Sequence, residues 1–367
     1  MDKAIEVIRG FNHERVLVIG DVMLDSYFEG TATRLSPEGP VPVVKAQRKV
    51  FLPGGAANTA VNVKSLGAHV DLLSVIGCDI TAELLKRALL KRGVGVEHLI
   101  EDRKRCTTNK LRIIADSQYL ARFDEEDTSD LCGETEERFI EQFRQLFAVC
   151  DVAIISDYLK GVITSRFISE LSELNSSHEK LIVLDSKDLR HRQFCNISVI
   201  TPNHIEAQKA SNLKVKVRNG TPQPWQLERI GRELLETIKT RWVLITLGAE
   251  GALLFERDLP TYRTRSRQVE NPQVIGAGDT FTSALALALG GGADIRVAAE
   301  IATTAAGVAV AKKRTAAVSQ QELLQQVQLV VNTGKISRDL SKELEVPRSF
   351  DSEDAGGEVS WLGIGAR

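Results

Sequence analysis

The stretch Ile-Gly-Ala-Gly-Asp-Thr at residues 275–280 is suited by residue type and spacing to binding a phosphate group. The glycines let the backbone turn sharply and come close to a ligand. Residues 281–289 are rich in helix formers, and three glycines end them. The first turn of a helix leaves backbone N–H groups unpaired and carries the positive end of the helix dipole. We therefore predict an anion site built from the backbone of Gly276, Ala277 and Gly278.

Asp279 places a carboxylate in the first turn of this helix. One interpretation is a helix cap, because a carboxylate there can accept from unpaired N–H groups. The other is a general base that takes the proton from a hydroxyl attacking the bound phosphate. Phosphoryl transfer needs both positioned donors and a group that orients the nucleophile. The short motif leaves both interpretations open, so the rest of the chain must provide the substrate, nucleotide and metal sites.

A second pair of glycines, Gly54 and Gly55, opens a run of small residues that is predicted to be a helix. It is either a tight turn before a closely packed helix or backbone that approaches a ligand. In the second case Asn58, in the first turn of the predicted helix, points at that ligand.

Short apolar runs alternate with helical stretches along most of the chain, which predicts a parallel sheet covered by helices on both faces. Strands are expected at residues 15–20, 70–77, 152–157, 181–185, 199–203 and 242–248, with 251–255 as a hairpin partner. Helices are expected at residues 1–13, 81–92, 133–149, 294–312 and 320–333. Residues 26–52 read instead as short strands with proline breaks, and residues 107–122 return to strand-like alternation. These two segments suggest a small separate sheet.

Polar side chains recur just past the ends of the predicted strands, at Asp21, Asp157, Asp185, Asn203 and Thr246. Ligands of open α/β sheets bind at the carboxyl ends of strands, so this recurrence predicts a single cleft along one sheet edge. Asp21 and Asp25 have an alternative interpretation as a turn aspartate and a helix cap. The basic residues Lys110, Arg112 and Arg122 either reach an anionic substrate or are solvated strand charges.

The composition of the chain argues against several classes of function. The chain has 367 residues, a net charge of −2, 43% apolar residues and 26% charged residues, so bulk charge argues against nucleic-acid binding. No N-terminal signal pattern and no apolar window long enough for a membrane span is present. The five scattered cysteines form no C-x-x-C pair, which suits reduced thiols and predicts a cytoplasmic protein.

Taken together, Gly54-Gly55-Ala56-Ala57-Asn58 and Gly276-Ala277-Gly278-Asp279 resemble the two signatures of ribokinase-like (PfkB-type) sugar kinases. Thr201-Pro202-Asn203-x-x-Glu206 and Thr246-Leu247-Gly248 lie between them, and the resemblance spans residues 15 to about 330. It implies a three-layer α/β/α fold, a mostly parallel sheet with a small β-sheet lid. The implied kinase domain is 11–333, with the lid from about 26–52 and 106–123, and 334–367 is a C-terminal extension.

Finer motifs look like those of the heptose 7-phosphate kinases. They are Gly20-Asp21-Val22-Met23-Leu24-Asp25, Leu35-Ser36-Pro37-Glu38-Gly39-Pro40, and Ser156-Asp157-Tyr158-Leu159-Lys160-Gly161. Those kinases transfer the γ-phosphate of ATP to the anomeric hydroxyl, giving heptose 1,7-bisphosphate for ADP-heptose and lipopolysaccharide synthesis. Many are fused to an adenylyltransferase domain with a His-x-Gly-His motif. This chain lacks the motif and therefore resembles the stand-alone kinase.

The resemblance assigns a role to each matching residue. Asp279 would be the base, and Gly276, Ala277 and Gly278 the anion hole. The expected sugar-site residues are Asp25, Gly54, Gly55, Asn58 and Asp157, and the candidates for the sugar phosphate are Lys110, Arg112, Arg122, Lys160 and Lys187. Asn203, Thr246, Gly248 and Thr303 would line the nucleotide site, and Glu206 would hold Mg²⁺, through water. ATP and Mg²⁺ are the implied cofactors, K⁺ is left open, and a homodimer through the lid is the implied assembly.

The chain departs from the family pattern at four places. Gln273-Val274-Ile275 stands where Asp-x-Thr is usual, and Ser186 stands where the family has proline. Thr303 and Thr304 occupy the region of an expected Asn, and Lys313-Arg314-Thr315 replaces a Gly-Thr. The alternatives left open are a kinase for another sugar or nucleoside, such as fructose 6-phosphate, ribose or adenosine, and a weakly active sugar-binding sensor.

Overall fold

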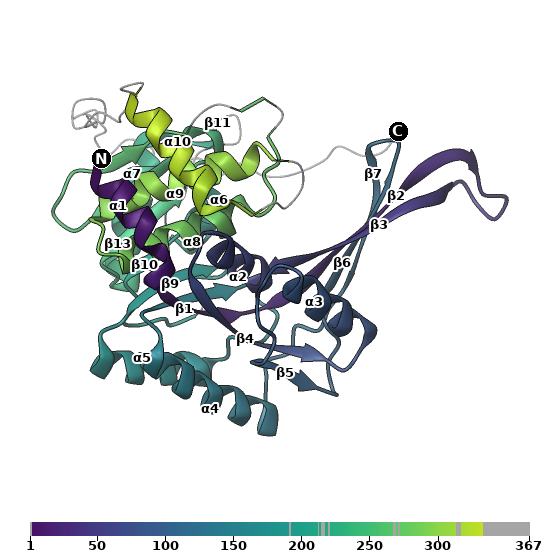
Figure 1. Cartoon of the computed structure of the whole chain (residues 1–367), viewed down its shortest axis with the longest axis horizontal. Coiled ribbons are helices and arrows are strands. Elements are labelled where there is room, and N and C mark those ends of the chain that lie inside the picture. Colours follow the sequence, from purple (N-terminus) through teal and green to yellow (C-terminus); the bar gives the residue numbers. More distant parts are fainter. Residues whose placement is uncertain are drawn as a thin grey trace, which may run out of the picture.

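The computed structural model describes residues 2–190, 192–211, 213, 217–218, 221–266, 269–270, 272–312 and 317–332. Within them the chain forms a large sheet with helices on both faces, and a smaller sheet projects from it (Figure 1). This confirms the predicted fold class, a mostly parallel α/β sheet with a small lid sheet. The predicted C-terminal extension and Lys313-Arg314-Thr315 lie outside the described residues.

The large sheet is built from short, almost fully buried strands. They are β1 (Arg15–Gly20), β4 (His69–Gly77), β5 (Leu99–Asp102), β8 (Val152–Asp157), β9 (Leu181–Ser186), β10 (Val199–Ile200), β13 (Trp242–Thr246), β14 (Ala252–Glu256) and β15 (Tyr262–Thr264). Their order is β15-β14-β13-β10-β9-β8-β1-β4-β5. The strands from β13 to β5 pair in parallel, and β14 and β15 pair antiparallel. The chain runs outward on both sides of the β1–β8 pair, so the topological switch point lies there.

Alternation along the strands creates two cores. In β1, Val16 and Val18 face one core, and Leu17 and Ile19 face the other. The first core is covered by α1 (Asp2–Arg9), α2 (Ala56–Ser65), α3 (Ile80–Leu90), α8 (Ala277–Gly290), α9 (Ile295–Val310) and α10 (Gln320–Asn332). The second is covered by α4 (Gly133–Val149), α5 (Ser165–His178), α6 (His204–Ala210) and α7 (Pro224–Ile238). Short pieces complete the described chain, namely η1 (Gly10–His13), η2 (Gly248–Glu250), β11 (Val217–Arg218) and β12 (Thr221–Pro222).

The lid is a four-stranded sheet in the order β3-β2-β6-β7. Its strands are β2 (Val22–Leu35), β3 (Pro42–Gly55), β6 (Asn109–Ala115) and β7 (Gln118–Glu125). The expectation of short strands broken by prolines was wrong, because β2 and β3 are long and continuous. Pro53 pairs with Leu24 inside β3. Because β3 is the edge strand of the lid, the missing N–H of a proline is tolerated there.

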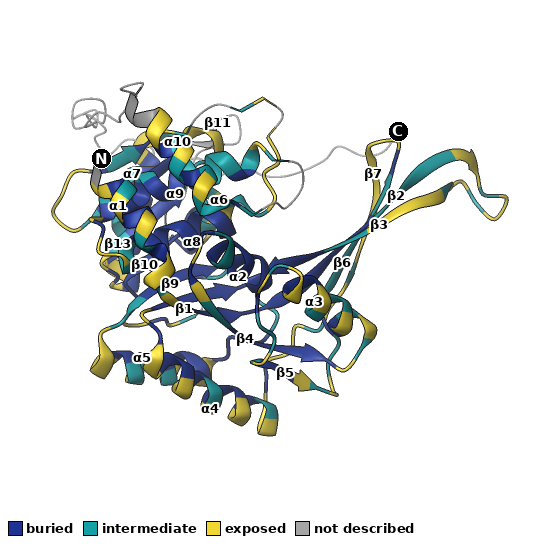
Figure 2. Cartoon of the chain, in the orientation of Figure 1, coloured by how far each residue is buried: buried dark blue, intermediate teal, exposed yellow. Residues whose placement is uncertain are grey.

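The lid is joined to the large sheet at the switch point. β2 starts two residues after β1 ends, and β3 leads directly into α2. The joint is tight, because a Cβ on Gly20 (φ +149°) would lie 1.9 Å from the carbonyl oxygen of Ser156. Figure 2 shows the strands of the large sheet buried and the outer part of the lid exposed. None of the helices in the described ranges is long and apolar enough to cross a membrane.

Candidate active site

The N-terminus of α8 opens toward free space. Gly276 is its N-cap in a left-handed conformation (φ +82°), which favours glycine. Gly278 is exposed, and a Cβ built on it would meet nothing within 4 Å. The first-turn amides therefore border a space that a phosphate group could fill.

Asp279 does not cap this helix, because its carboxylate oxygens accept from Asn58 and Tyr158 and not from first-turn amides. Its side chain is buried, and each carboxylate oxygen accepts one hydrogen bond. Asn58 Nδ2 donates to Oδ2 at 2.6 Å, and the Tyr158 hydroxyl donates to Oδ1 at 2.8 Å. Asn58 thus points at the acid that the sequence singled out, and its contact with a ligand stays a prediction.

The protonation of Asp279 follows from these neighbours. Burial raises the pKa of this carboxyl to about 6, and the nearby Asp185 carboxylate adds to the increase. The hydrogen bonds from Asn58 and Tyr158 and the charge of Lys187 oppose it. At neutral pH the group is ionised and has a pKa close enough to 7 for a general base.

Lys187 is held between two carboxylates. Its ammonium lies 2.8 Å from Glu206 Oε1 and 3.2 Å from Asp185 Oδ1. Burial disfavours the charged ammonium, but Asp185 and Glu206 outweigh it, so the pKa of Lys187 is raised. The same ammonium lies 5.0 Å from the centre of the Tyr158 ring. A fixed positive charge therefore stands beside the partner of Asp279.

Asn203 and Glu206 form a capping box at the start of α6. Asn203 Oδ1 accepts from the amides of Ile205 and Glu206, and Glu206 Oε2 accepts from the amide of Asn203. A bridge from Asn203 to Thr246 brings the end of β13 alongside. Gly248 follows at φ +60° with open space beside it. Three of the four predicted nucleotide residues therefore lie on adjoining segments, next to Lys187.

Asp25 sits in the lid strand β2, buried against Gly54 and Arg112. Arg112 donates to Asp25 Oδ1 at 2.7 Å, and a Cβ on Gly54 would lie 2.6 Å from Asp25 Oδ2. Asp25 pairs with Lys110 across strands, and Arg112 pairs with Arg122. Cross-strand partners share a face of a sheet, so these predicted sugar-site residues lie on one face of the lid.

Every basic residue predicted for the sugar phosphate has an acidic partner. Arg122 forms a two-pronged pair with Asp124 at 2.7 and 2.9 Å. Lys110 lies 3.7 Å from Asp124 and 4.0 Å from Glu126, and Lys160 lies 2.8 Å from Glu126. Glu126 thus links a lid lysine to the loop after β8.

Two predicted site residues, Asp157 and Thr303, make their contacts with residues other than those described above. The Asp157 side chain is fully buried and accepts hydrogen bonds from the Leu159 amide and the Ser186 hydroxyl. It also forms an ion pair with Arg192 at 3.1 Å. Burial raises the pKa of Asp157 to about 6. Thr303 is buried against Thr264, with their hydroxyl oxygens 2.7 Å apart. Both side chains therefore have partners within the fold.

Asp185 and Tyr158 were not among the residues assigned a role from the sequence. Asp185 was visible as an acid past a strand end. Tyr158 appeared only within the motif at residues 156–161 and received no role, because nothing local indicates that its hydroxyl reaches a residue 121 positions away.

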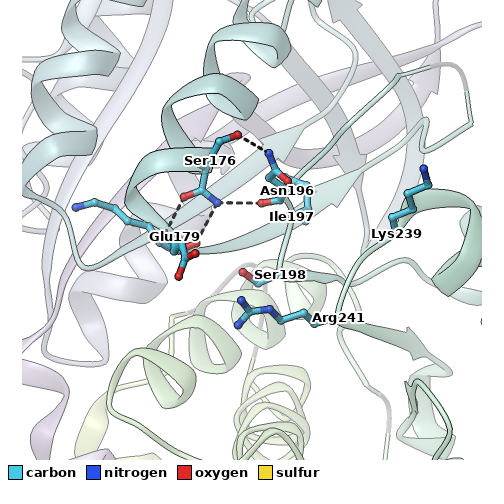
Figure 3. A pocket seen from close by; sticks show the side chains of 9 residues that line it. Ser176, Glu179, Asn196, Ile197, Ser198, Lys239 and Arg241 are labelled. Atoms are coloured by element: carbon cyan, nitrogen blue, oxygen red, sulfur yellow. Dashed lines mark hydrogen bonds between the residues drawn. The ribbon is translucent and has the colours of Figure 1, made fainter.

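A separate pocket lies at the other end of the strands, where β9, β10 and β13 begin (Figure 3). Its lining includes Glu179, Asn196, Ser198, Lys239 and Arg241. None of the residues predicted to take part in chemistry lines it.

Comparison with known proteins identifies the family. The family model described as pfkB family carbohydrate kinase matches residues 13–322. The bifunctional protein HldE of Desulfatibacillum aliphaticivorans is 37% identical over 318 residues, which cover 87% of this chain and 64% of the relative. HldE of Geobacter sulfurreducens is 37% identical over 313 residues, covering 84% and 62%. This chain thus spans less than two thirds of the length of these relatives.

Solved structures agree with the fold. Phosphofructokinase-2 from Escherichia coli in complex with potassium superposes with a TM-score of 0.72 at 20% identity, covering 87% of this chain and 99% of that one. Arabidopsis thaliana ribokinase complexed with ribose and ATP gives a TM-score of 0.68 at 17% identity, covering 86% and 99%.

Proposed function

Because this chain belongs to the pfkB family of carbohydrate kinases, we propose that it phosphorylates D-glycero-D-manno-heptose 7-phosphate at the anomeric hydroxyl. Family membership makes it a sugar kinase that uses ATP. The heptose is supported by the motifs around Asp21, Gly54 and Tyr158 and by the HldE relatives. The observation that carries the chemistry is the buried Asp279 carboxylate at the open N-terminus of α8.

In the proposed reaction Asp279 accepts the proton of the anomeric hydroxyl. The sugar oxygen forms a bond to the γ-phosphorus of ATP, the bond to the bridging oxygen breaks, and ADP leaves. The amides of Gly276, Ala277 and Gly278 face the negative charge that develops on the transferred group. The proton then leaves Asp279 for solvent as the product departs.

The polar groups beside α8 suit a magnesium nucleotide. Mg²⁺ keeps several waters and takes one or two carboxylates together with the phosphates. Glu206 would hold it, through water, and Asn203, Thr246 and Gly248 would line the nucleotide. When bound, the ion draws charge from the phosphate oxygens. Lys187, fixed beside Glu206, adds a second positive charge on the same side.

We assign the sugar phosphate to Lys110 and Lys160. The 7-phosphate and the anomeric hydroxyl lie at opposite ends of the sugar, which excludes Lys187 beside the base. Arg112 is committed to Asp25, and Arg122 is half exposed and paired with Asp124. The two lysines come from the lid and from the loop after β8, and Glu126 holds both. A phosphate that replaced Glu126 would close the lid over the sugar and exclude water.

The test is ATP consumption by the purified chain with Mg²⁺, offered heptose 7-phosphate, sedoheptulose 7-phosphate, fructose 6-phosphate, ribose or adenosine. Turnover on heptose 7-phosphate alone, at least 100-fold above the other acceptors, supports the proposal. Faster turnover on another acceptor refutes the heptose assignment. Absence of turnover on all five refutes the proposed activity.

We also propose that the chain forms a homodimer through the lid. The lid face turned away from Asp25 carries Phe28, Leu111, Ile113 and Phe123, as the register requires. These side chains are only partly buried, and Phe123 is 62% exposed. A second copy of the same face would cover this apolar surface.

A further inference from the structure

Tyr158 lies between Asp279, which its hydroxyl contacts, and Lys187, whose ammonium lies over its ring. It directly follows β8, and its amide donates to Asp21 Oδ2 at 2.7 Å. The amides of Lys160 and Val162 donate to the same carboxylate at 3.1 Å each. Asp21, which the sequence places just past the end of a predicted strand, therefore holds the loop that carries Tyr158 through three hydrogen bonds.

The ring of Tyr158 is confined on two sides. Gly55, at the start of α2, lies against it, since a Cβ there would be in van der Waals contact with Tyr158 Cδ2 at 3.5 Å. Lys187 covers the ring with its ammonium 5.0 Å from the centre, and Asp185 and Glu206 hold that ammonium in place. Held between these groups, the ring brings its hydroxyl 2.8 Å from Asp279 Oδ1.

We propose that Tyr158 is a positioning residue for phosphoryl transfer, whose hydroxyl fixes the plane of the Asp279 carboxylate and keeps that group ready to accept a proton. This inference rests on the proposed function. Tyr158 itself gives up no proton. Burial, followed by the charge of Asp279 and Asp185, raises the pKa of the phenol, so it remains an O–H donor.

The groups that act on Asp279 come from three elements. Asn58 of α2 and Tyr158 after β8 donate to it, and Asp185 and Lys187 of the β9 end act through their charges. Glu206 of α6 faces the phenol. A hydrogen bond to an ionised carboxylate lowers its pKa, so losing Tyr158 should raise the pKa of Asp279.

The experiment compares Tyr158→Phe with wild type in the pH dependence of kcat and KM. In Tyr158→Phe the acidic limb of kcat should move up by about one pH unit, the order expected for one hydrogen bond to a charged group. Above pH 8, kcat should still be lower by roughly 10-fold, because the carboxylate is less well oriented. The KM for the sugar should change by less than about twofold.

Tyr262→Phe is a matched control. Tyr262 also donates to a carboxylate at 2.8 Å, that of Glu300, and carries a cation over its ring, Arg296 at 5.3 Å. Its removal should leave the pH profile unchanged. An unmoved limb in Tyr158→Phe overturns the proposal, and so does a higher KM with kcat unchanged, which would make Tyr158 a sugar contact.

A second measurement separates this inference from the choice of sugar. The carboxyl ¹³C signal of Asp279, identified by its loss in Asp279→Asn, reports the pKa of that group without any substrate. A higher pKa in Tyr158→Phe supports the coupling even if heptose 7-phosphate proves inert, and an equal pKa refutes it. If Tyr158→Phe does not fold, 3-fluorotyrosine at position 158, a stronger donor of nearly the same shape, should move the same pKa down.

Discussion

At the scale of single residues, the burial of Asp279 suits the proposed proton transfer but lowers the stability of the folded protein at neutral pH. Its carboxylate is buried, and within the described part of the chain two neutral groups donate to it. That placement gives the proposed base a pKa of about 6, and it also leaves a charge in a poorly solvated position. Both consequences can be measured with one substitution.

Asp279→Asn should lower kcat by at least about 100-fold, the usual contribution of a general base. The KM for ATP should change little, because the backbone of Gly276 and Gly278 is untouched. Steady-state kinetics with saturating sugar provides the test. A variant that turns over like wild type would remove Asp279 from the role of base.

The same variant should be more stable than wild type at pH 8. Folding raises the pKa of Asp279 from 3.8 to about 6, so the folded state holds its proton more tightly. The stabilisation from this group is therefore complete below about pH 4 and is lost as the pH rises through 6. Asp279→Asn escapes that loss, worth up to about 3 kcal/mol. Denaturant unfolding at pH 8 and pH 4 measures it, and equal stability at pH 8 would contradict it.

Lys160→Met and Lys110→Met should each raise the KM for a sugar phosphate by roughly 10- to 100-fold, the loss of a charge-assisted contact. Arg122→Met is the matched control, because Arg122 is half exposed and paired with Asp124, and its KM should stay near wild type. The measurement is KM for sugar phosphate beside KM for ATP. A rise for Arg122→Met alone would move the phosphate site to the lid edge.

At the scale of helices and strands, some bounds could be predicted from the sequence and others could not. The strands β1 and β8 and the helix α4 have the bounds that their apolar patterns predict. The amphipathic signal is local, so a single segment is enough to find them. The extent of β2 and β3 could not be found this way, since their pairing with each other overrides the proline signal. The pairing of every predicted phosphate-binding cation with an acid depends likewise on lid register and loop position.

Gly278→Ala tests α8 as an element. The methyl meets no atom within 4 Å, and alanine is the better helix former, so stability should rise by roughly 0.5–1 kcal/mol. The same methyl would occupy space beside the first-turn amides, and kcat/KM for ATP should fall at least tenfold if phosphate binds there. Thermal unfolding and ATP kinetics on one preparation give both numbers. Unchanged kinetics would place the phosphate elsewhere.

On the scale of the whole molecule, the lid has two faces with different chemistry. One face carries the charged residues Asp25 and Lys110, and the opposite face carries the aromatic residues Phe28 and Phe123. The two faces are what a lid shared between substrate and partner would require.

Phe123→Glu should convert the proposed dimer to a monomer, because it places a charge in the apolar lid face. Val149→Glu, at a 51% exposed position on α4, is the control for adding a charge elsewhere. Sedimentation velocity of wild type and both variants measures the oligomeric state of each. A wild-type chain that is monomeric at all concentrations would refute assembly through the lid.

The separation of Asn58 and Asp279 along the chain sets a time order for a newly made molecule. They are 221 residues apart, with Tyr158 between them. At 5–20 residues per second, the ribosome delivers Asp279 roughly 10 to 40 s after Asn58. For that interval the proposed sugar-site residue Asn58 has been made without the proposed base. The proposed proton acceptor can therefore meet Asn58 and Tyr158 only after α8 has been synthesised.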